Sequence, residues 1–226
     1  MAGQIVTFAS NGGQAEGYLA TPPSNKGPGV IVIQEWWGLN DNIKDISNRF
    51  AAEGYVALAP DLYHGENTTE PDEAGKMMMA MKMDEAAKDL AGAVDYLKSH
   101  DAVGPRKVGS VGFCLGGGLS LFLASIEPVD ACVIYYGVLP GAQEDLDNVK
   151  CPVLGHYAEH DEFASPDMAR ELEKELRAKG VQVEFHVYDG TNHAFFNDTR
   201  ADAHAPEAAK VSWERTLAFF GQHLKR

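Results

Sequence analysis

Residues 107–118 read KVGSVGFCLGGG and join a short apolar strand to a run of glycines. Cys114 lies between Gly112 and Gly116, in the position that a nucleophile takes on a sharp turn between a strand and a helix. Such an elbow is strained and leaves almost no room for side chains beside the nucleophile, so the flanking glycines favour it. The alternative is a buried structural cysteine beside a glycine-rich turn. The rest of the chain is needed to separate the two.

The composition predicts one folded domain, residues 1–226. A chain of 226 residues with 45% hydrophobic residues can bury a substantial core. No apolar run approaches the roughly 18 to 20 residues that cross a bilayer, and the N-terminus lacks the pattern of a signal peptide. Cys114, Cys132 and Cys151 form no C-x-x-C pair, which favours a reducing compartment. We therefore expect a soluble, cytoplasmic protein with no membrane partner.

The formal net charge of −14 limits the possible partners. Phosphate binding draws on clustered lysines and arginines, which this chain does not show, so nucleic acid is not expected as a partner. The negative charge also gives anionic substrates no general attraction. A ligand that carries an acid group would need a local cation.

Strands and helices alternate along the chain. The turn sequence at 11–13 predicts an antiparallel N-terminal hairpin at a sheet edge, and the β-branched run at 30–33 predicts a strand buried on both faces. The rhythm predicts an α/β fold with a mostly parallel, doubly wound sheet flanked by helices. Strands are expected at 5–9, 17–20, 30–33, 55–59, 108–111, 131–136, 152–157 and 183–188, and helices at 41–51, 71–99, 115–125, 166–179 and 206–224.

The expected helix over 71–99 carries four methionines in its first half. We interpret them as packing residues; the alternative is that they line an adaptable pocket. They are Met77, Met78, Met79 and Met81.

A cysteine nucleophile needs a base, and the base needs an orienting acid. The order nucleophile, acid, histidine selects Asp161, just after the seventh expected strand, and His193, just after the eighth. The carboxyl ends of parallel strands meet at one edge of a sheet, where open α/β sheets bind their ligands. Cys114, Asp161 and His193 are therefore expected to lie together.

Other acids and histidines compete for these roles. Asp189 is closer to His193 in sequence, but we expect it to shape a turn with Gly190. His156 and His160 are rival bases, and residues 156–160 (HYAEH) also match the H-x-x-E-H pattern of inverted zinc proteases. The ligands of that pattern share one face of a helix, whereas the preceding residues resemble a buried strand. We therefore predict no metal site.

Attack on a carbonyl also requires donors for the developing oxyanion. The backbone N–H of Leu115, directly after the nucleophile, is one expected donor, and the N–H of Trp36, after the third strand, is the other. The indole rings of Trp36 and Trp37 are expected to form the wall of a pocket.

Five motifs occur in the order QEWWGLN (34–40), PDLY (60–63), GFCLGG (112–117), YYG (135–137) and NHAF (192–195). Together they resemble the dienelactone hydrolase family of α/β hydrolases over nearly the whole chain. The resemblance implies the α/β-hydrolase fold, a triad of Cys114, His193 and Asp161, and hydrolysis of an ester or lactone through a thioester. It also implies that Glu35 helps to activate the thiol when a substrate carboxylate enters. An unperturbed cysteine has a pKa of about 8.5, so a route to the thiolate is required.

The chain departs from that family where the substrate is recognised. Members that cleave dienelactone hold the substrate carboxylate with two arginines; the matching positions here hold Lys76 and Asn197. Arg200 lies near enough in sequence to replace the second arginine. Because lysine is not equivalent to arginine at a bidentate carboxylate site, weak or absent dienelactone activity is expected.

The leading hypothesis is a cysteine-dependent hydrolase of a small-molecule ester or lactone. It uses no cofactor and is a monomer or weak homodimer. The alternative is a non-catalytic ligand-binding or thiol-sensing protein on the same scaffold, because a fold does not determine activity.

Overall fold

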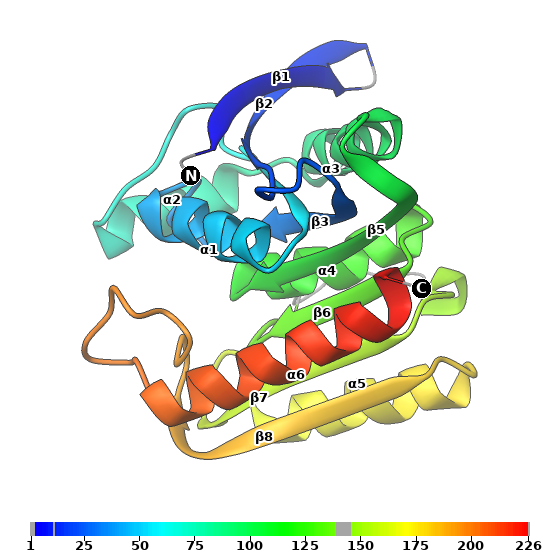
Figure 1. The fold of residues 1–226 in the computed structure, drawn as a ribbon. Coiled ribbons are helices and arrows are strands. Elements are labelled where there is room, and N and C mark those ends of the chain that lie inside the picture. The colour runs from blue at the N-terminus through cyan, green and yellow to red at the C-terminus, as the bar shows by residue number, and fades with distance from the viewer. Residues whose placement is uncertain (1–2, 11, 139–145, 226) are drawn as a thin grey trace.

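One eight-stranded sheet runs through the molecule (Figure 1). The computed structural model describes residues 3–10, 12–138 and 146–225. The strand order is β1-β2-β4-β3-β5-β6-β7-β8; β3 to β8 are parallel, and the β1–β2 hairpin joins β4 in the antiparallel direction. The expected sheet and its N-terminal hairpin are therefore confirmed, although Asn11 of the expected turn lies outside the described residues. The strands are β1 (Gln4–Ser10), β2 (Gly13–Ala20), β3 (Gly27–Ile33), β4 (Val56–Pro60), β5 (Val103–Phe113), β6 (Ala131–Tyr135), β7 (Val153–His160) and β8 (Val183–Asn192).

Helices cover both faces of the sheet. Figure 1 shows α1 and α6 over one face, and α3, α4 and α5 over the other. None of the helices in the described ranges is both long enough and apolar enough to cross a membrane. The helices are α1 (Asp41–Ala52), α2 (Pro71–Ala80), α3 (Met83–Ser99), α4 (Leu115–Ile126), α5 (Pro166–Ala178) and α6 (Pro206–Leu224), with a short 3-10 helix at Leu146–Asn148.

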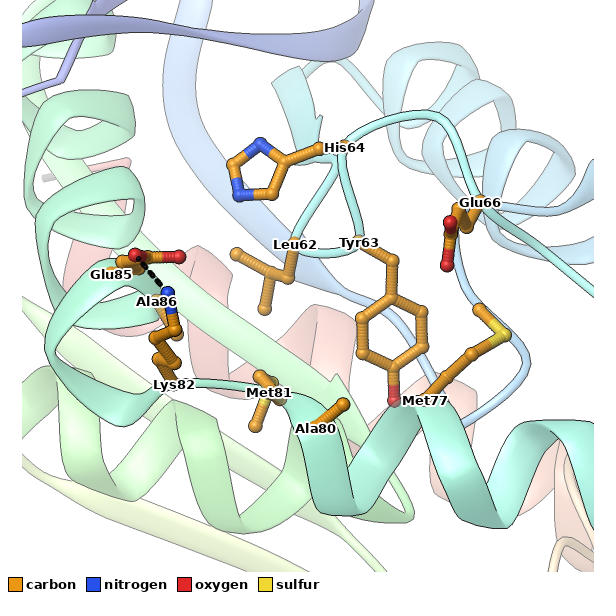
Figure 2. A pocket seen from close by; sticks show the side chains of 10 residues that line it. All are labelled: Leu62, Tyr63, His64, Glu66, Met77, Ala80, Met81, Lys82, Glu85 and Ala86. Atoms are coloured by element: carbon orange, nitrogen blue, oxygen red, sulfur yellow. Dashed lines mark hydrogen bonds and ion pairs between the residues drawn. The ribbon is translucent and has the colours of Figure 1, made fainter.

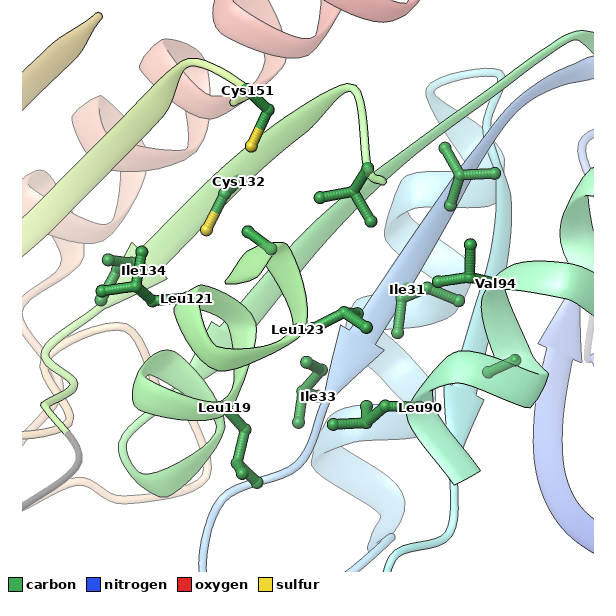
Figure 3. Close-up of a cluster of buried hydrophobic side chains, with 14 of the residues drawn as sticks. Ile31, Ile33, Leu90, Val94, Leu119, Leu121, Leu123, Cys132, Ile134 and Cys151 are labelled. Carbon is green, nitrogen blue, oxygen red and sulfur yellow. The ribbon is translucent and has the colours of Figure 1, made fainter. Parts of the chain in front are cut away.

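The central strand β3 shows how the sheet separates two hydrophobic cores. Val30 and Val32 belong to the cluster under α1 and α6, whereas Ile31 and Ile33 belong to the cluster under α3 and α4. Figure 3 shows the second cluster, in which Leu90 of α3 faces the strand. Successive side chains of a strand point to opposite faces, so a continuous β-branched run supplies both cores at once.

The expected continuous helix over 71–99 is wrong, because the chain forms α2 and α3 with a break between them. Met81 and Lys82 have extended backbones at the break, with ψ of 126° and 117°. Met77 and Met81 pack against the core cluster that contains Tyr63, and Figure 2 shows all three around a cavity of about 150 Å³. No proline or glycine marks this break, so tertiary packing has overridden the local helical preference.

The carboxyl ends of four parallel strands carry the residues singled out above. Glu35 follows β3, Cys114 follows β5, Asp161 follows β7 and His193 follows β8. Because these strands are parallel, their ends lie along one edge of the sheet. The topology alone therefore brings residues from four distant parts of the sequence to one region.

Candidate active site

Cys114 occupies a tight elbow between β5 and α4. Its backbone has φ 55° and ψ −119°, a conformation that residues other than glycine rarely adopt, and its N–H donates to the carbonyl of Tyr135 at 3.0 Å. A Cβ on Gly112 would lie 1.7 Å from the carbonyl oxygen of Gly116, and a Cβ on Gly116 would lie 2.4 Å from that of Ile33. The glycines are therefore required for the chain to turn here.

The exposure of the thiols separates Cys114 from the other two cysteines. Cys114 is partly exposed, whereas Cys132 and Cys151 are buried. Burial raises the pKa of the Cys151 thiol far above its usual range. A thiol in such surroundings is inert, whereas a partly exposed one can meet a ligand. The alternative of a buried structural cysteine therefore does not fit position 114.

Asp161 and His193 form a hydrogen-bonded pair beside the elbow. Oδ2 of Asp161 lies 2.7 Å from Nδ1 of His193. The other carboxylate oxygen, Oδ1, accepts the N–H groups of Phe163 at 2.8 Å and Ala164 at 2.9 Å. Both oxygens of Asp161 are thus held, so the carboxylate is fixed in position and orients the imidazole.

Electrostatics favour charge on both members of this pair. Burial alone would lower the pKa of His193, but hydrogen bonds with Asp161 and Cys114 outweigh burial and raise that pKa to about 10. Burial alone would raise the pKa of Asp161, but its hydrogen bond with His193 and the N–H donors hold that pKa below its usual range. The site is therefore built to stabilise an imidazolium next to a carboxylate.

Glu35 is a buried acid at the back of the same site. It is 2% exposed, and its Oε2 accepts a hydrogen bond of 2.8 Å from Nδ2 of Asn197. The amide oxygen of Asn197 accepts from the N–H of Thr199 at 3.1 Å and from its hydroxyl at 2.6 Å, so the amide nitrogen must face Glu35. Burial raises the pKa of Glu35, although Asn197 and the charge of His193 act in the opposite direction.

The partly exposed thiol opens into a cleft of about 230 Å³. Trp36 and Trp37 line it with their rings 4.9 Å apart in an edge-on arrangement. Leu115 also lines it and begins α4, so its N–H has no acceptor within the helix. The lining residues are Glu35, Trp36, Trp37, Met78, Cys114, Leu115, Tyr136, Val138, Phe163, Ala164, His193, Ala194 and Arg200.

The three residues expected at a substrate carboxylate have different surroundings. Lys76 points outward from α2 and pairs with Glu73 at 2.6 Å, away from the residues that line the cleft. Asn197 is buried and holds Glu35. Arg200 does line the cleft, and its guanidinium pairs with the exposed carboxylate of Asp202.

The sequence analysis gave no individual role to Tyr136 or Phe163, which line the cleft beside His193. The ring centroid of Tyr136 lies 5.1 Å from that of His193, and the ring centroid of Phe163 lies 5.4 Å from it. The YYG motif was the signal in the sequence for Tyr136. Among the four methionines, Met78 lines the cleft, while Met77 and Met81 pack against the core and Met79 is 78% exposed.

The rival histidine at 156 is an internal packing residue. Its two ring nitrogens lie 2.8 Å from the hydroxyl of Tyr188 and 3.0 Å from that of Thr216. Burial lowers its pKa well below the usual range. The whole zinc-protease pattern at 156–160 lies on β7 and not on a helix, so its histidines do not share a helical face.

The expected turn at Asp189 and Gly190 is wrong, because β8 continues through both residues to Asn192. The N–H of Gly190 donates to Oε2 of Glu159 at 2.6 Å, and the pairing register with β7 shifts nearby. β8 advances by four residues while β7 advances by two, so this bulge inserts two residues without ending the strand. The longer strand carries His193 to the edge where Asp161 lies.

Comparisons with known proteins agree with the fold and the motifs. The sequence profile of the dienelactone hydrolase family matches residues 15–224. Protein usf of Aquifex pyrophilus is 44% identical over 98% of this chain and 99% of its own length. A protein of Aquifex aeolicus (strain VF5) named "Putative carboxymethylenebutenolidase" is 40% identical over 99% of this chain and 100% of its own.

A solved structure has the same architecture. The crystal structure named "Putative Dienelactone Hydrolase" from Klebsiella pneumoniae subsp. pneumoniae MGH 78578 superposes with a TM-score of 0.86 at 30% identity. The match covers 97% of this chain and 100% of that one, and it confirms the expected α/β-hydrolase fold. Taken with the profile match over 15–224, these similarities show that this chain belongs to the dienelactone hydrolase family.

Proposed function

We propose that this protein hydrolyses small carboxylic esters or lactones, with Cys114 as nucleophile, His193 as base and Asp161 as the acid that orients the base. The observation that carries the proposal is the 2.7 Å contact between Asp161 and His193 beside a partly exposed thiol on a strained elbow. The family and its relatives, one of them named as a carboxymethylenebutenolidase, support the same reaction class.

Acylation begins when the Cys114 thiol passes its proton to Nε2 of His193, whose Nδ1–H is donated to Asp161. The sulfur then bonds to the substrate carbonyl carbon, and the carbonyl oxygen becomes an oxyanion that faces the N–H groups of Leu115 and Trp36. The carbon–oxygen bond to the leaving alkoxide breaks, and His193 returns the proton to that oxygen. With a lactone, the new alcohol stays attached to the acyl group.

Deacylation repeats these steps with water. His193 removes a proton from water, and the hydroxide oxygen attacks the thioester carbonyl carbon. The carbon–sulfur bond breaks, the acid leaves, and the proton returns to the sulfur of Cys114. Asp161 stays hydrogen-bonded to the imidazolium while each tetrahedral intermediate forms.

Glu35 is proposed to assist the first proton transfer. Its carboxylate is buried in the wall of the cleft that also contains the thiol, and burial raises its pKa. A buried carboxylate that takes up a proton loses its desolvation penalty, so Glu35 can accept the thiol proton in place of His193 when the imidazole is already protonated. Asn197 holds the carboxylate in place through a neutral hydrogen bond, which leaves proton uptake possible.

The test is turnover of p-nitrophenyl acetate by the native chain and by Cys114→Ala and His193→Ala. Each variant should lose at least about 10³-fold in kcat, because members of a catalytic triad act as a unit. Urea unfolding should show that both variants remain folded. Mass spectrometry of the acid-quenched native enzyme should find one acyl group on Cys114.

Unchanged turnover by Cys114→Ala would contradict the proposed function. A different result would favour the ligand-binding or thiol-sensing alternative: alkylation of Cys114 by iodoacetamide together with no turnover across a panel of esters and lactones. Both functions can therefore be tested on the same preparation of protein.

A further inference from the structure

The positive charge of the cleft comes from Arg200 and His193, and each of them is already paired with a carboxylate of the protein, Asp202 and Asp161 respectively. Among the described residues that line it, Arg200 is the one with a permanently cationic side chain, and its Nε donates to Oδ1 of Asp202 at 3.3 Å. Glu35 brings an acid to the same cleft. Both ends of the Asn197 amide already form hydrogen bonds: Nδ2 donates to Glu35, and Oδ1 accepts from Thr199. A substrate carboxylate that entered would share Arg200 with Asp202 and would lie in the field of Glu35.

The remaining walls of the cleft are predominantly apolar. Phe163 is 72% exposed and Met78 is 38% exposed, and both line the cleft with Trp36 and Val138. Exposed apolar side chains that gather at a cleft mark a surface that a ligand covers. Methionine suits this role because its flexible, polarisable side chain adapts to ligand shape.

Phe163 is held in place although its ring is exposed. Its N–H donates to Asp161 at 2.8 Å, and its ring lies 5.4 Å from the imidazole of His193 in an edge-on arrangement. The carboxylate that orients the base thus also anchors the backbone of Phe163. A group attached to a carbonyl carbon at Cys114 would pass this ring.

We propose that this cleft binds esters and lactones whose acyl part is an uncharged, apolar chain or ring, and that Phe163 and Met78 are its specificity-determining residues. The two side chains cover the acyl part and remove it from water, while the paired Arg200 gives a terminal carboxylate little compensation for lost hydration. This inference rests on the proposed hydrolase function for its kinetic test, but its binding test needs no turnover.

The binding test compares 2-octanone with 7-oxooctanoate. Both are methyl ketones that cannot be hydrolysed, and they differ only in whether the far end of the same chain is a methyl group or a carboxylate. Titration followed by tryptophan fluorescence, which reports on Trp36 and Trp37 in the cleft, should give a dissociation constant at least about tenfold lower for 2-octanone. Equal or tighter binding of 7-oxooctanoate would overturn the proposal.

The kinetic test uses p-nitrophenyl esters from acetate to hexanoate. Each added methylene that the cleft buries should raise kcat/KM by up to about fourfold. Met78→Ala should reduce the rise of kcat/KM with acyl-chain length, and Phe163→Ala should reduce it further. Phe163→Leu should restore part of that rise. Met79→Ala is the matched control: Met79 is the next residue on α2, is exposed and does not line the cleft, so its series should match the native one.

The outcomes separate the inference from the function it rests on. A flat series in the native chain, with Cys114-dependent turnover of the acetate, would overturn the inference and leave the hydrolase function standing. Equal slopes for Met78→Ala and Met79→Ala would remove Met78 from the specificity site. No turnover of any ester, with 2-octanone still preferred over 7-oxooctanoate, would overturn the hydrolase function and leave the apolar binding site standing.

Discussion

Glu35 is an acid that is buried at a cost in stability. Its carboxyl group accepts a hydrogen bond from Asn197, and the hydroxyl of Tyr136 is a second neutral donor beside it, yet burial outweighs both and raises the pKa of Glu35. The charged form therefore loses hydration that it does not fully recover. A protein that kept this acid only for structure would gain by replacing it, which supports a chemical role.

Glu35→Gln should change how stability depends on pH. The folded pKa of Glu35 is raised above its ordinary value of 4.5, so above that pH the folded chain binds more protons at this site than the unfolded chain. The free energy of unfolding of the native chain should consequently fall relative to Glu35→Gln as the pH rises from 4.5, with a slope of at most about 1.4 kcal/mol per pH unit.

Urea unfolding at a series of pH values measures this difference. Glu214→Gln serves as a control because Glu214 is an exposed residue in the middle of α6. Its effect should be about 0.5 kcal/mol or less at every pH, as for most surface substitutions. If the free energies of unfolding of the native chain and of Glu35→Gln differed by the same amount at every pH, the raised pKa of Glu35 would be contradicted.

At the scale of elements, the elbow between β5 and α4 depends on close approach of backbone segments. The turn at Cys114 brings Gly112 against Gly116, and Gly117 lies against the carbonyl of Tyr135, where a Cβ would be at 2.7 Å. Cys114 is therefore positioned by three glycines and the strands beside them. The atoms that an added Cβ would meet at these glycines belong to the backbone, so no side-chain rotation could relieve the clash.

Gly112→Ala should damage both stability and activity. Its Cβ would lie 1.7 Å from the Gly116 carbonyl oxygen, so the elbow must shift. We expect a loss of more than about 2 kcal/mol in the free energy of unfolding, at the upper part of the range for overpacking, and loss of ester turnover. Urea unfolding and p-nitrophenyl acetate hydrolysis provide the two measurements.

Gly75→Ala is the matched control for that substitution. Gly75 lies inside α2 with no atom within 4 Å of an added Cβ. Alanine there should stabilise the chain by about 0.5 to 1 kcal/mol, since glycine is unfavourable inside a helix. If both glycine variants changed stability by the same amount, the steric account of the elbow would be wrong.

At the scale of the whole molecule, the sheet is held between two cores, and α6 closes one of them. Phe220 of α6 is fully buried and lies against the rings of Phe50 and Tyr55, at 5.9 and 6.0 Å. These contacts tie the last helix of the chain to α1 and to the start of β4. The core at the amino ends of the strands, on the side away from the cleft, is therefore closed by residues from both halves of the sequence.

Phe220→Ala should lower the free energy of unfolding by about 3 to 5 kcal/mol, the usual cost of removing a buried phenylalanine ring. Phe219→Ala is the comparison, because the neighbouring Phe219 is only partly buried. Its loss should be clearly smaller. Denaturant unfolding of the two variants measures the difference, and equal losses would show that α6 does not seal this core as described.

The order of the elements, and the sheet edge at which the candidate site lies, could be predicted from the sequence. Strand patterns, glycines and β-branched runs act locally, so they could be read residue by residue. The parallel topology then required Cys114, Asp161 and His193 to share one edge. The break between α2 and α3 was missed because Met81 is a good helix former whose extended backbone follows from packing against the core.

What the sequence determined by itself is the family, the hydrolase class and the sheet edge that Cys114, Asp161 and His193 share, because those depend on local motifs in a set order. The tertiary structure decided which side chains line the cleft. Asn197 and Glu35 are 162 residues apart and meet only in the fold. Whether Lys76 points away from the cleft while Met78 faces it depends on how α2 is turned, and that direction is set by long-range packing that no local pattern encodes.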